Sequence, residues 1–337
     1  MLKNFKKRLI QKIQIHPPNY LVENKINVAI QLNDYFTRQN WLNSIEGVLK
    51  DNQQFNFLFI QNKYQLIRII NFCDAGFFFD LSSSYLYPAT NIKMIYLGVS
   101  GFEFEPDHSP KLKLYSSKGI SSLAIAEYVL STTIFIVNGY NNCIENKVLR
   151  RWEQKSILSQ DFKRIENYKI GIWGVGNNGK AISEKFANLG CKVFGCDKQI
   201  SNEFPFIHQW VMETEIEKFC NSIDILVICI PGLNQTKYLI DYDFMKKYLQ
   251  GKYIINVARG NIINQKDLKR CIREKILAGA VLDVLEKEPL PIYDSLWHFK
   301  NVIITPHISG NINRFISNIQ DDFLKRIVSE FNQQTTT

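Results

Sequence analysis

The chain has 337 residues, of which 45% are hydrophobic and 22% are charged, so it is long enough for two domains with substantial cores and is not a disordered chain. Its formal net charge is +9, but the basic residues are spread out and no basic stripe carries interleaved aromatic side chains, which disfavours a nucleic-acid partner. No segment reaches transmembrane length and no apolar signal core follows the basic N-terminus, so we expect a cytoplasmic protein without a membrane partner.

Apolar runs alternate with helical periodicity from residue 26 onward, after an expected N-terminal extension of about twenty residues. The pattern predicts strands over residues 26–32 and 55–60, helices over 35–49 and 64–70, and short apolar runs at 77–81 and 94–97. This alternation is typical of a parallel sheet that helices cover on both faces. The first unit is predicted to end near residues 114–117.

A long helix is predicted over residues 123–137, with apolar side chains on nearly all of its faces. So much apolar surface favours burial against a second domain or a second subunit. We therefore expect a homodimer formed through this helix. Residues 150–168 are polar, with Trp152 as the expected anchor.

A second series of strands and helices starts at residue 169. Six short strands with intervening helices suit one doubly wound domain. A last amphipathic helix, over residues 313–331, is expected to pack on the first domain. The six strands are predicted over residues 169–173, 192–196, 225–230, 253–257, 279–282 and 302–305.

The seven cysteines are an odd number, and none of them pair at the spacing of a metal site. Cys191 and Cys196 are separated by four residues, unlike the two of a CxxC motif. We therefore expect a reduced protein with thiols in its core and no bound metal.

The most informative stretch is "KIGIWGVGNNGKAISEKF", in which Gly174, Gly176 and Gly179 form a GxGxxG motif between a strand and a helix. In this setting the glycines allow a tight turn, close approach of the backbone to a pyrophosphate, and close packing of helix on strand. A second strand ends at Asp197, 18 residues after Gly179. A carboxylate there accepts hydrogen bonds from the ribose of NAD and repels the 2′-phosphate of NADP, although Lys198 weakens that preference.

Three further residues follow strands of the same domain. Arg259 follows the strand of "INVARGNIIN", Asp283 follows the next, and His307 follows the last, in "NVIITPHISG". The carboxyl ends of parallel strands meet at one edge of the sheet, where open α/β sheets bind ligands. Convergence of these loops on the glycine-loop edge favours an active site over a loop histidine bonded to a backbone carbonyl.

These motifs together resemble the D-isomer-specific 2-hydroxyacid dehydrogenases, from about residue 26 to 331. The matching segments are the GxGxxG motif, "NVARG", "DVLEKEPLP" and "LWHFKNVIITPHISG", and the last of these is most similar to the glyoxylate/hydroxypyruvate reductase branch. The resemblance implies an α/β fold with two Rossmann-like or flavodoxin-like domains. A doubly wound NAD-binding domain, residues 119–306, is inserted in a discontinuous substrate domain made of residues 1–118 and 307–337.

The implied reaction is interconversion of a small 2-oxo acid and its D-2-hydroxy acid with NADH. His307 protonates the carbonyl oxygen, Glu288 holds the imidazole and favours its protonated form, and Arg259 binds the substrate carboxylate. Backbone amides around Ser100 and Gly101 contact the same carboxylate. The implied cofactor site consists of Gly174, Gly176, Asn177, Asn178, Gly179, Asp197, Pro231, Val257, Ala258, Arg259, Asp283 and His307, with Asp283 on the nicotinamide carboxamide.

The chain also departs from the family pattern at Asn177 and Asn178, where Arg or His and then Ile or Leu are usual, and at Phe102 and Glu103 in the substrate loop. Alternatives on the same scaffold are phosphoglycerate dehydrogenase and formate dehydrogenase, and the latter typically pairs its histidine with Gln rather than with an acid such as Glu288. A corepressor or scaffold that senses NAD without catalysis is the alternative from another class.

Overall fold

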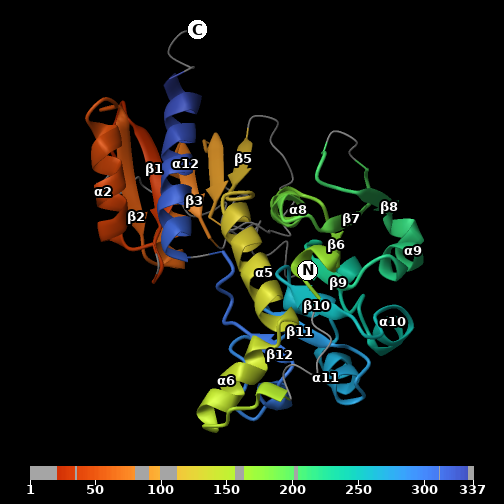
Figure 1. The fold of residues 1–337 in the computed structure, drawn as a ribbon. Coiled ribbons are helices and arrows are strands. Elements are labelled where there is room, and N and C mark those ends of the chain that lie inside the picture. Colours follow the sequence, from red (N-terminus) through yellow and green to blue (C-terminus); the bar gives the residue numbers. More distant parts are fainter. Residues whose placement is uncertain are drawn as a thin grey trace, which may run out of the picture. The chain divides into compact units, whose positions relative to one another are not determined.

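The computed structural model describes residues 21–34, 36–79, 91–98, 112–155, 163–200, 204–310 and 312–332. The predicted N-terminal extension and the substrate-loop residues Ser100 and Gly101 lie outside this set. The chain forms two compact units (Figure 1). The first unit comprises residues 1–120 and 312–337, and the second comprises residues 121–311.

The first unit is built on a five-stranded parallel sheet with the order β2-β1-β3-β4-β5. This is the strand order of flavodoxin-like domains. The strands are β1 (Ile26–Gln31), β2 (Phe55–Ile60), β3 (Ala75–Phe78), β4 (Met94–Leu97) and β5 (Lys113–Ser116), and the helices are α2 (Arg38–Leu49), α3 (Lys63–Ile69) and α12 (Ile312–Asn332), with a 3-10 turn at Ile70–Phe72.

Helices cover both faces of this sheet. On one face, Trp41 of α2 and Phe323 of α12 pack edge-on against Phe77 of β3, with ring centroids 4.9 and 5.4 Å apart. On the other face, Leu66 and Ile69 of α3 are buried against the sheet. The C-terminal helix therefore completes the first unit, as its amphipathic pattern predicted.

The second unit contains a seven-stranded parallel sheet with the order β12-β11-β10-β9-β6-β7-β8. Counted from β6, this is the doubly wound order of dinucleotide-binding domains with one strand added at an edge. The strands are β6 (Lys169–Trp173), β7 (Lys192–Asp197), β8 (Gln209–Met212), β9 (Ile225–Ile228), β10 (Tyr253–Asn256), β11 (Gly279–Leu282) and β12 (Val302–Ile304).

Two apolar layers enclose this sheet. One layer packs α5 and α8 against it, and the other packs α9, α10 and α11 against the opposite face. The predicted fold class, α/β with two parallel sheets, is confirmed. The helices are α5 (Ser122–Val137), α6 (Tyr140–Val148), α8 (Asn177–Asn188), α9 (Ile216–Asn221), α10 (Tyr242–Tyr248) and α11 (Gln265–Arg273), with 3-10 helices at Ile165–Asn167, Glu213–Glu215, Asn234–Thr236, Gly260–Ile262 and Ser295–His298.

The long apolar helix α5 uses one face within its own unit. Ile125, Val129 and Ile136 are buried against the sheet layer that also holds α8. Ser122 donates from its hydroxyl to Asn178 Oδ1 at 2.7 Å, which ties the start of α5 to α8. No single helix of the described residues is long and apolar enough to cross a membrane. Helices α5 and α6, which are bent by 68° relative to each other, reach the length and apolar composition of a membrane span only when they are taken together.

Three elements were not predicted from the sequence: β5, β8 and α6. The strands β5 and β8 are four-residue edge strands, and their residues are mostly half-buried or exposed. An edge strand with little buried surface lacks the apolar run by which buried strands are recognised. Helix α6 has no buried residue, and its apolar side chains Tyr140, Ile144 and Val148 are exposed and set among polar ones.

Candidate functional site

The carboxyl ends of six neighbouring strands carry the residues singled out in the sequence. Because all strands of the second sheet are parallel, these ends lie along one edge. The order of strands changes direction between β6 and β9, which is the usual position of a dinucleotide crevice. Gly174 follows β6, Asp197 ends β7, Pro231 follows β9, Arg259 follows β10, Asp283 follows β11 and His307 follows β12.

The three glycines of the loop after β6 meet different constraints. Gly174 has φ +94°, and a Cβ there would lie 2.7 Å from the carbonyl carbon of Cys229. A Cβ on Gly179 would overlap the carbonyl oxygen of Gly174. By contrast, a Cβ on Gly176 would meet nothing within 4 Å. The fold therefore requires the first and third glycines, whereas the open space at Gly176 fits the close approach of a pyrophosphate.

Helix α8 begins directly after this loop, with Gly176 at its N-cap and no acidic residue in its first turn. Its free backbone amides and positive dipole end suit a phosphate. Asn177 is exposed at this end. Asn178, also predicted to bind the cofactor, accepts the Ser122 hydroxyl through Oδ1, so its side chain is used within the fold.

Asp197 is fixed against the glycine loop. Its Oδ2 accepts a hydrogen bond from Val175 N at 2.7 Å, and its Oδ1 accepts one from Lys198 N at 2.7 Å. The ammonium of Lys198 lies 4.0 Å from Glu213 Oε2, while Glu213 Oε1 accepts from the indole of Trp173 at 3.1 Å. The Lys198 ammonium thus has a carboxylate partner in Glu213, which the sequence reasoning had not identified.

Arg259 lies on a turn that Asn256 holds together. Asn256 is only 1% exposed, donates through Nδ2 to Arg259 O at 2.9 Å and accepts from Ala258 N at 3.0 Å. The Arg259 side chain is exposed, and its stem passes so close to Gly232 that a Cβ there would lie 2.5 Å from Cγ. Asn256 was missed as a site residue, although an asparagine that ends a strand before a tight turn is a recognisable signal.

The remaining predicted cofactor residues near this turn differ in exposure. Val257 and Ala258 bury their side chains in the two core layers, so any contact with a cofactor uses their backbone. Pro231 is exposed, and its carbonyl accepts the buried Thr236 hydroxyl at 2.7 Å. That bond shapes the loop after β9.

His307 and Glu288 are brought together. The imidazole Nδ1 lies 2.9 Å from Glu288 Oε2, and Glu288 Oε1 accepts from Leu285 N at 2.9 Å, which orients the carboxylate. The side chains are 54% and 39% exposed, so the pair is open to solvent in the second unit. Because Glu288 occupies Nδ1, Nε2 is the ring nitrogen left for a substrate.

The neighbouring acid, Glu286, bonds a different element. Its Oε1 accepts from Gln265 N at 2.6 Å, and its own amide donates to Gln265 Oε1 at 3.2 Å. These bonds satisfy backbone at the start of α11. Of the two acids, only Glu288 contacts the histidine.

Asp283 is buried beneath the turn that carries His307. It is 1% exposed, and its carboxylate accepts hydrogen bonds from Thr305 Oγ1 at 2.6 Å, Ile308 N at 2.8 Å and Ser309 N at 3.0 Å. The backbone carbonyl of Asp283 also accepts from His307 N at 2.9 Å. These bonds attach residues 307–309 to the second unit, whereas the sequence analysis had begun the second segment of the substrate domain at residue 307. The contact of Asp283 with a nicotinamide carboxamide stays a prediction.

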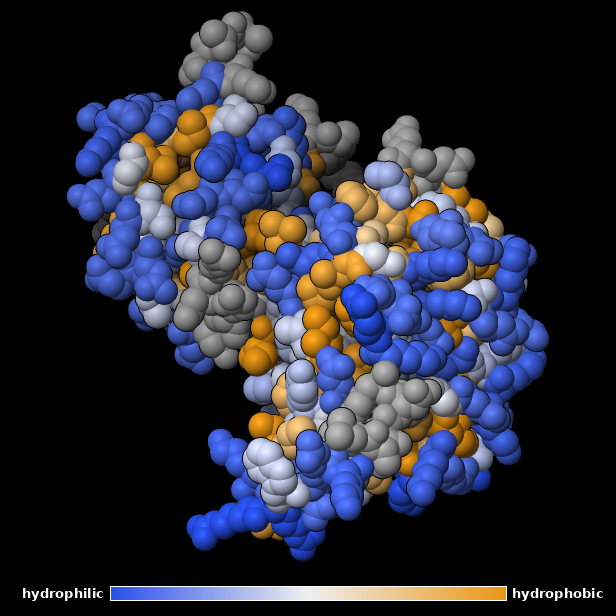
Figure 2. All heavy atoms as spheres, in the orientation of Figure 1, coloured by the Kyte–Doolittle hydropathy of each residue, from blue (hydrophilic) through white to orange (hydrophobic). Residues whose placement is uncertain are grey.

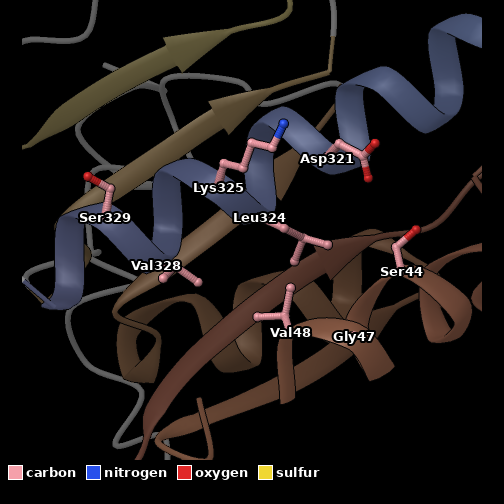
Figure 3. A pocket seen from close by; sticks show the side chains of 8 residues that line it. All are labelled: Ser44, Gly47, Val48, Asp321, Leu324, Lys325, Val328 and Ser329. Carbon is pink, nitrogen blue, oxygen red and sulfur yellow. The ribbon is translucent and has the colours of Figure 1, made fainter. Parts of the chain in front are cut away.

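A groove in the first unit has fewer groups suited to catalysis than the sheet edge of the second unit. It lies between α2 and α12, where Figure 3 shows Val48 and Leu324 facing each other across it. Its polar lining consists of Asp321, Lys325 and two serines. Among the described residues, no group of three or more His, Cys, Asp or Glu side chains is arranged to hold a metal ion. The sheet edge of the second unit is therefore the candidate site.

Comparison with known proteins agrees with this geometry. The family model "D-isomer specific 2-hydroxyacid dehydrogenase, NAD binding domain" matches residues 130–309, more than half of the chain. Glyoxylate reductase of Thermofilum pendens is 27% identical over 229 residues, which cover 66% of this chain and 67% of that protein. Glyoxylate/hydroxypyruvate reductase A of Salmonella choleraesuis is 29% identical over 168 residues, so the match covers 50% of this chain and about half, 53%, of that relative.

Solved structures share the fold at low sequence identity. NADPH-dependent glyoxylate/hydroxypyruvate reductase from Sinorhizobium meliloti, solved with NADP and sulfate, matches with a TM-score of 0.76 and 18% identity over 92% of this chain and 96% of that one. A D-isomer specific 2-hydroxyacid dehydrogenase from Lactobacillus delbrueckii ssp. bulgaricus, in its NAD complex, matches with a TM-score of 0.73 and 20% identity over 91% and 97% of the two chains.

Proposed function

The chain belongs to the D-isomer-specific 2-hydroxyacid dehydrogenases, a family of oxidoreductases, and from this premise we propose that it interconverts a small 2-oxo acid and the D-2-hydroxy acid. The resemblance inferred from the sequence motifs is thereby confirmed. The observation that carries the proposal is the His307–Glu288 contact of 2.9 Å, on the sheet edge that also bears Arg259 and the glycine loop.

Each group has a chemical part in the proposed reaction. The cofactor is a nicotinamide dinucleotide, and when bound it supplies the hydride. His307 donates a proton from Nε2 to the carbonyl oxygen as the alcohol forms, and takes it back in the reverse direction. Glu288 orients the ring through its contact with Nδ1. Arg259 binds the substrate carboxylate with its planar fork of donors.

The proposed substrate is glyoxylate or hydroxypyruvate. This choice is supported by the names of the relatives from Thermofilum and Salmonella and by the similarity of the "LWHFKNVIITPHISG" segment to that branch. The backbone amides around Ser100 and Gly101, outside the described residues, are proposed to contact the same carboxylate as Arg259.

The proposed cofactor is NAD(H) rather than NADP(H). Asp197 ends β7 with its carboxylate bonded to the glycine loop, and a carboxylate there repels a 2′-phosphate. The Lys198 ammonium lies 4.0 Å from Glu213, and this second negative charge supports the same preference. The solved complex of the Sinorhizobium enzyme contains NADP, so this preference is a proposal about the present residues and not a property carried over from relatives.

The proposed assembly is a homodimer through α5 and α6. Figure 2 shows a mainly hydrophilic surface on the visible face, with smaller apolar areas between the polar ones. Exposed apolar side chains occur at the start of α5, along α6 and in the residues after α6, and such a cluster favours an interface. These side chains are Leu123, Tyr140, Ile144, Val148, Leu149 and Trp152, the last of them 93% exposed.

A cytoplasmic location is proposed with this assembly. All seven cysteines are free, and burial raises the pKa of the Cys196 and Cys220 thiols to about 12. Protonated core thiols are typical of proteins in reducing compartments.

The test is turnover of a panel of 2-oxo acids with NADH and NADPH, followed at the nicotinamide absorbance. We expect glyoxylate or hydroxypyruvate to be reduced with NADH. His307→Ala should lower turnover by about two to four orders of magnitude, and Glu288→Gln should lower it far more than the matched control Glu286→Gln. NADH binding without turnover of any 2-oxo acid would contradict the proposal and favour a sensing role.

A further inference from the structure

Three side chains form a continuous hydrogen-bonded line from helix α5 to the turn that carries His307. Tyr128 Oη, from α5, lies 2.6 Å from Thr305 Oγ1. Thr305 Oγ1, directly after β12, lies 2.6 Å from Asp283 Oδ1, directly after β11. The line joins parts of the second unit that are 22 and 177 residues apart in sequence.

The direction of the protons along this line is fixed by counting donors. An ionised carboxylate only accepts, so Thr305 donates its single hydroxyl proton to Asp283. Tyr128 must then donate to Thr305, because the threonine has no second proton to give. Burial raises the pKa of Tyr128 well above its ordinary value, so the phenol keeps its proton at any working pH.

Asp283 connects this hydrogen-bonded line to the turn that carries His307. Its carboxylate accepts the amides of Ile308 and Ser309, and its carbonyl accepts the amide of His307. His307 has φ +55°, a left-handed conformation that is uncommon for residues other than glycine and that the bonds to Asp283 hold in place here. The orientation of the Asp283 carboxylate therefore bears directly on the position of the imidazole.

We propose that Tyr128 is a positioning residue for His307, acting through Thr305 and Asp283. The proposal rests on the proposed function of His307 as proton donor. Without the phenol, the Thr305 hydroxyl loses the donor that fixes its rotamer and becomes free to turn away from Asp283. The buried carboxylate would then have two amide donors in place of three donors, and the turn would loosen.

Other charged groups contact the turn from separate elements. Glu288 bonds His307 Nδ1 from the loop after β11, and Asp283 lies within electrostatic range of Tyr128. The line from Tyr128 does not include Glu288, so its loss is expected to affect the placement of the ring rather than the protonation of the imidazole.

The experiment compares Tyr128→Phe, Thr305→Val, Thr305→Ser and the double variant Tyr128→Phe/Thr305→Val. Tyr253→Phe is the matched control, since Tyr253 is half-buried on β10 of the same sheet. The measurements are kcat and KM for the 2-oxo acid, the dissociation constant for NADH by fluorescence titration, and the midpoint of thermal unfolding.

We expect Tyr128→Phe to lower kcat about tenfold, the scale of one buried hydrogen bond, with KM and the NADH dissociation constant within about twofold of the parent. Thr305→Ser should keep most of the parent kcat because it keeps the hydroxyl, whereas Thr305→Val should have a lower kcat because it has none. The double variant should match Thr305→Val alone, because both changes break the same line. Tyr253→Phe should behave as the parent.

Three results would overturn the inference: a Tyr128→Phe protein with parent kcat, additive losses in the double variant, or a loss confined to NADH binding. Hydrogen exchange at the Ile308 and Ser309 amides supplies a readout that does not need activity. Faster exchange there in Tyr128→Phe, but not in Tyr253→Phe, is expected. If the parent reduces no 2-oxo acid, the proposed function fails, while unchanged exchange in Tyr128→Phe shows separately that Tyr128 does not hold the turn.

Discussion

Two single substitutions in the glycine loop can distinguish a glycine that serves cofactor binding, Gly176, from one that the fold requires, Gly179. Gly176→Ala and Gly179→Ala add the same methyl group three residues apart. At Gly176 the new Cβ would meet nothing within 4 Å, whereas at Gly179 it would overlap the carbonyl oxygen of Gly174. The two variants should therefore fail in different assays.

For Gly179→Ala the cost falls on folding. Helix propensity favours alanine by about 1 kcal/mol, but forcing a methyl group into filled space costs about 1–3 kcal/mol, and here the obstacle is backbone that no side-chain rotation relieves. We expect a net loss at the upper end of this difference, about 2 kcal/mol. In a domain of this size that corresponds to a thermal midpoint lowered by about 4–8 °C.

For Gly176→Ala the cost falls on the cofactor. The residue has φ −77° and ψ −156°, an extended conformation that alanine adopts without strain. The poorer N-cap character of alanine is offset by its less flexible unfolded chain, so the midpoint should stay within about 2 °C of the parent. A methyl group where the pyrophosphate approaches should remove one charge-assisted hydrogen bond, which weakens NADH binding about 10- to 100-fold.

The assays are thermal unfolding followed by circular dichroism and NADH titration followed by fluorescence, on both variants and the parent. The reasoning is refuted if Gly176→Ala binds NADH as tightly as the parent does, or if it loses as much thermal stability as Gly179→Ala. The first result would mean that the space at Gly176 is not the place of the cofactor, and the second that the fold itself requires this glycine.

Three further predictions concern the catalytic groups and the cofactor. Reduction should decline as pH rises and oxidation should increase, because reduction uses the protonated imidazole of His307. Glu288→Gln should lower turnover in both directions because the imidazole loses its orienting carboxylate, and pH profiles of the two directions that stay parallel would contradict the assignment of His307. Arg259→Lys should lower kcat/KM for the 2-oxo acid by at least about tenfold, since an ammonium lacks the bidentate fork; loss of NADH affinity in its place would show that Arg259 serves the cofactor. Asp197→Ser should improve kcat/KM with NADPH relative to NADH by removing the repelling charge, and an unchanged ratio of the two would exclude Asp197 as the discriminating group.

Local sequence patterns predicted much of this site. The motif of Gly174, Gly176 and Gly179 after a strand, and the polar residues Arg259, Asp283 and His307 after later strands, were sufficient to place four loops on one sheet edge. That inference works because parallel strands with right-handed crossovers bring all their carboxyl ends to the same side, whatever the details of packing. Buried strands such as β6 and β11 were likewise recognised within a residue, since burial on both faces demands an unbroken apolar run.

The support beneath the catalytic residues depended on tertiary structure. Tyr128 in the sequence is one more aromatic residue of an apolar helix, and Thr305 is the end of a strand; only packing brings their hydroxyl oxygens within 2.6 Å. The choice between Glu286 and Glu288 was made by a family resemblance, and the structure shows its physical basis, because Glu286 bonds the start of α11 while Glu288 reaches His307.

The sequence by itself thus determined most of the buried strands and helices and which strand ends carry chemistry, because hydrophobic periodicity and glycine spacing are local properties of the chain. The tertiary structure decided which side chain orients which, and it placed Asp283 under the His307 turn with three donors on its carboxylate. Hydrogen-bond partners across a sheet edge depend on distances of tenths of an ångström between loops of different strands, and no periodicity in the chain encodes those distances.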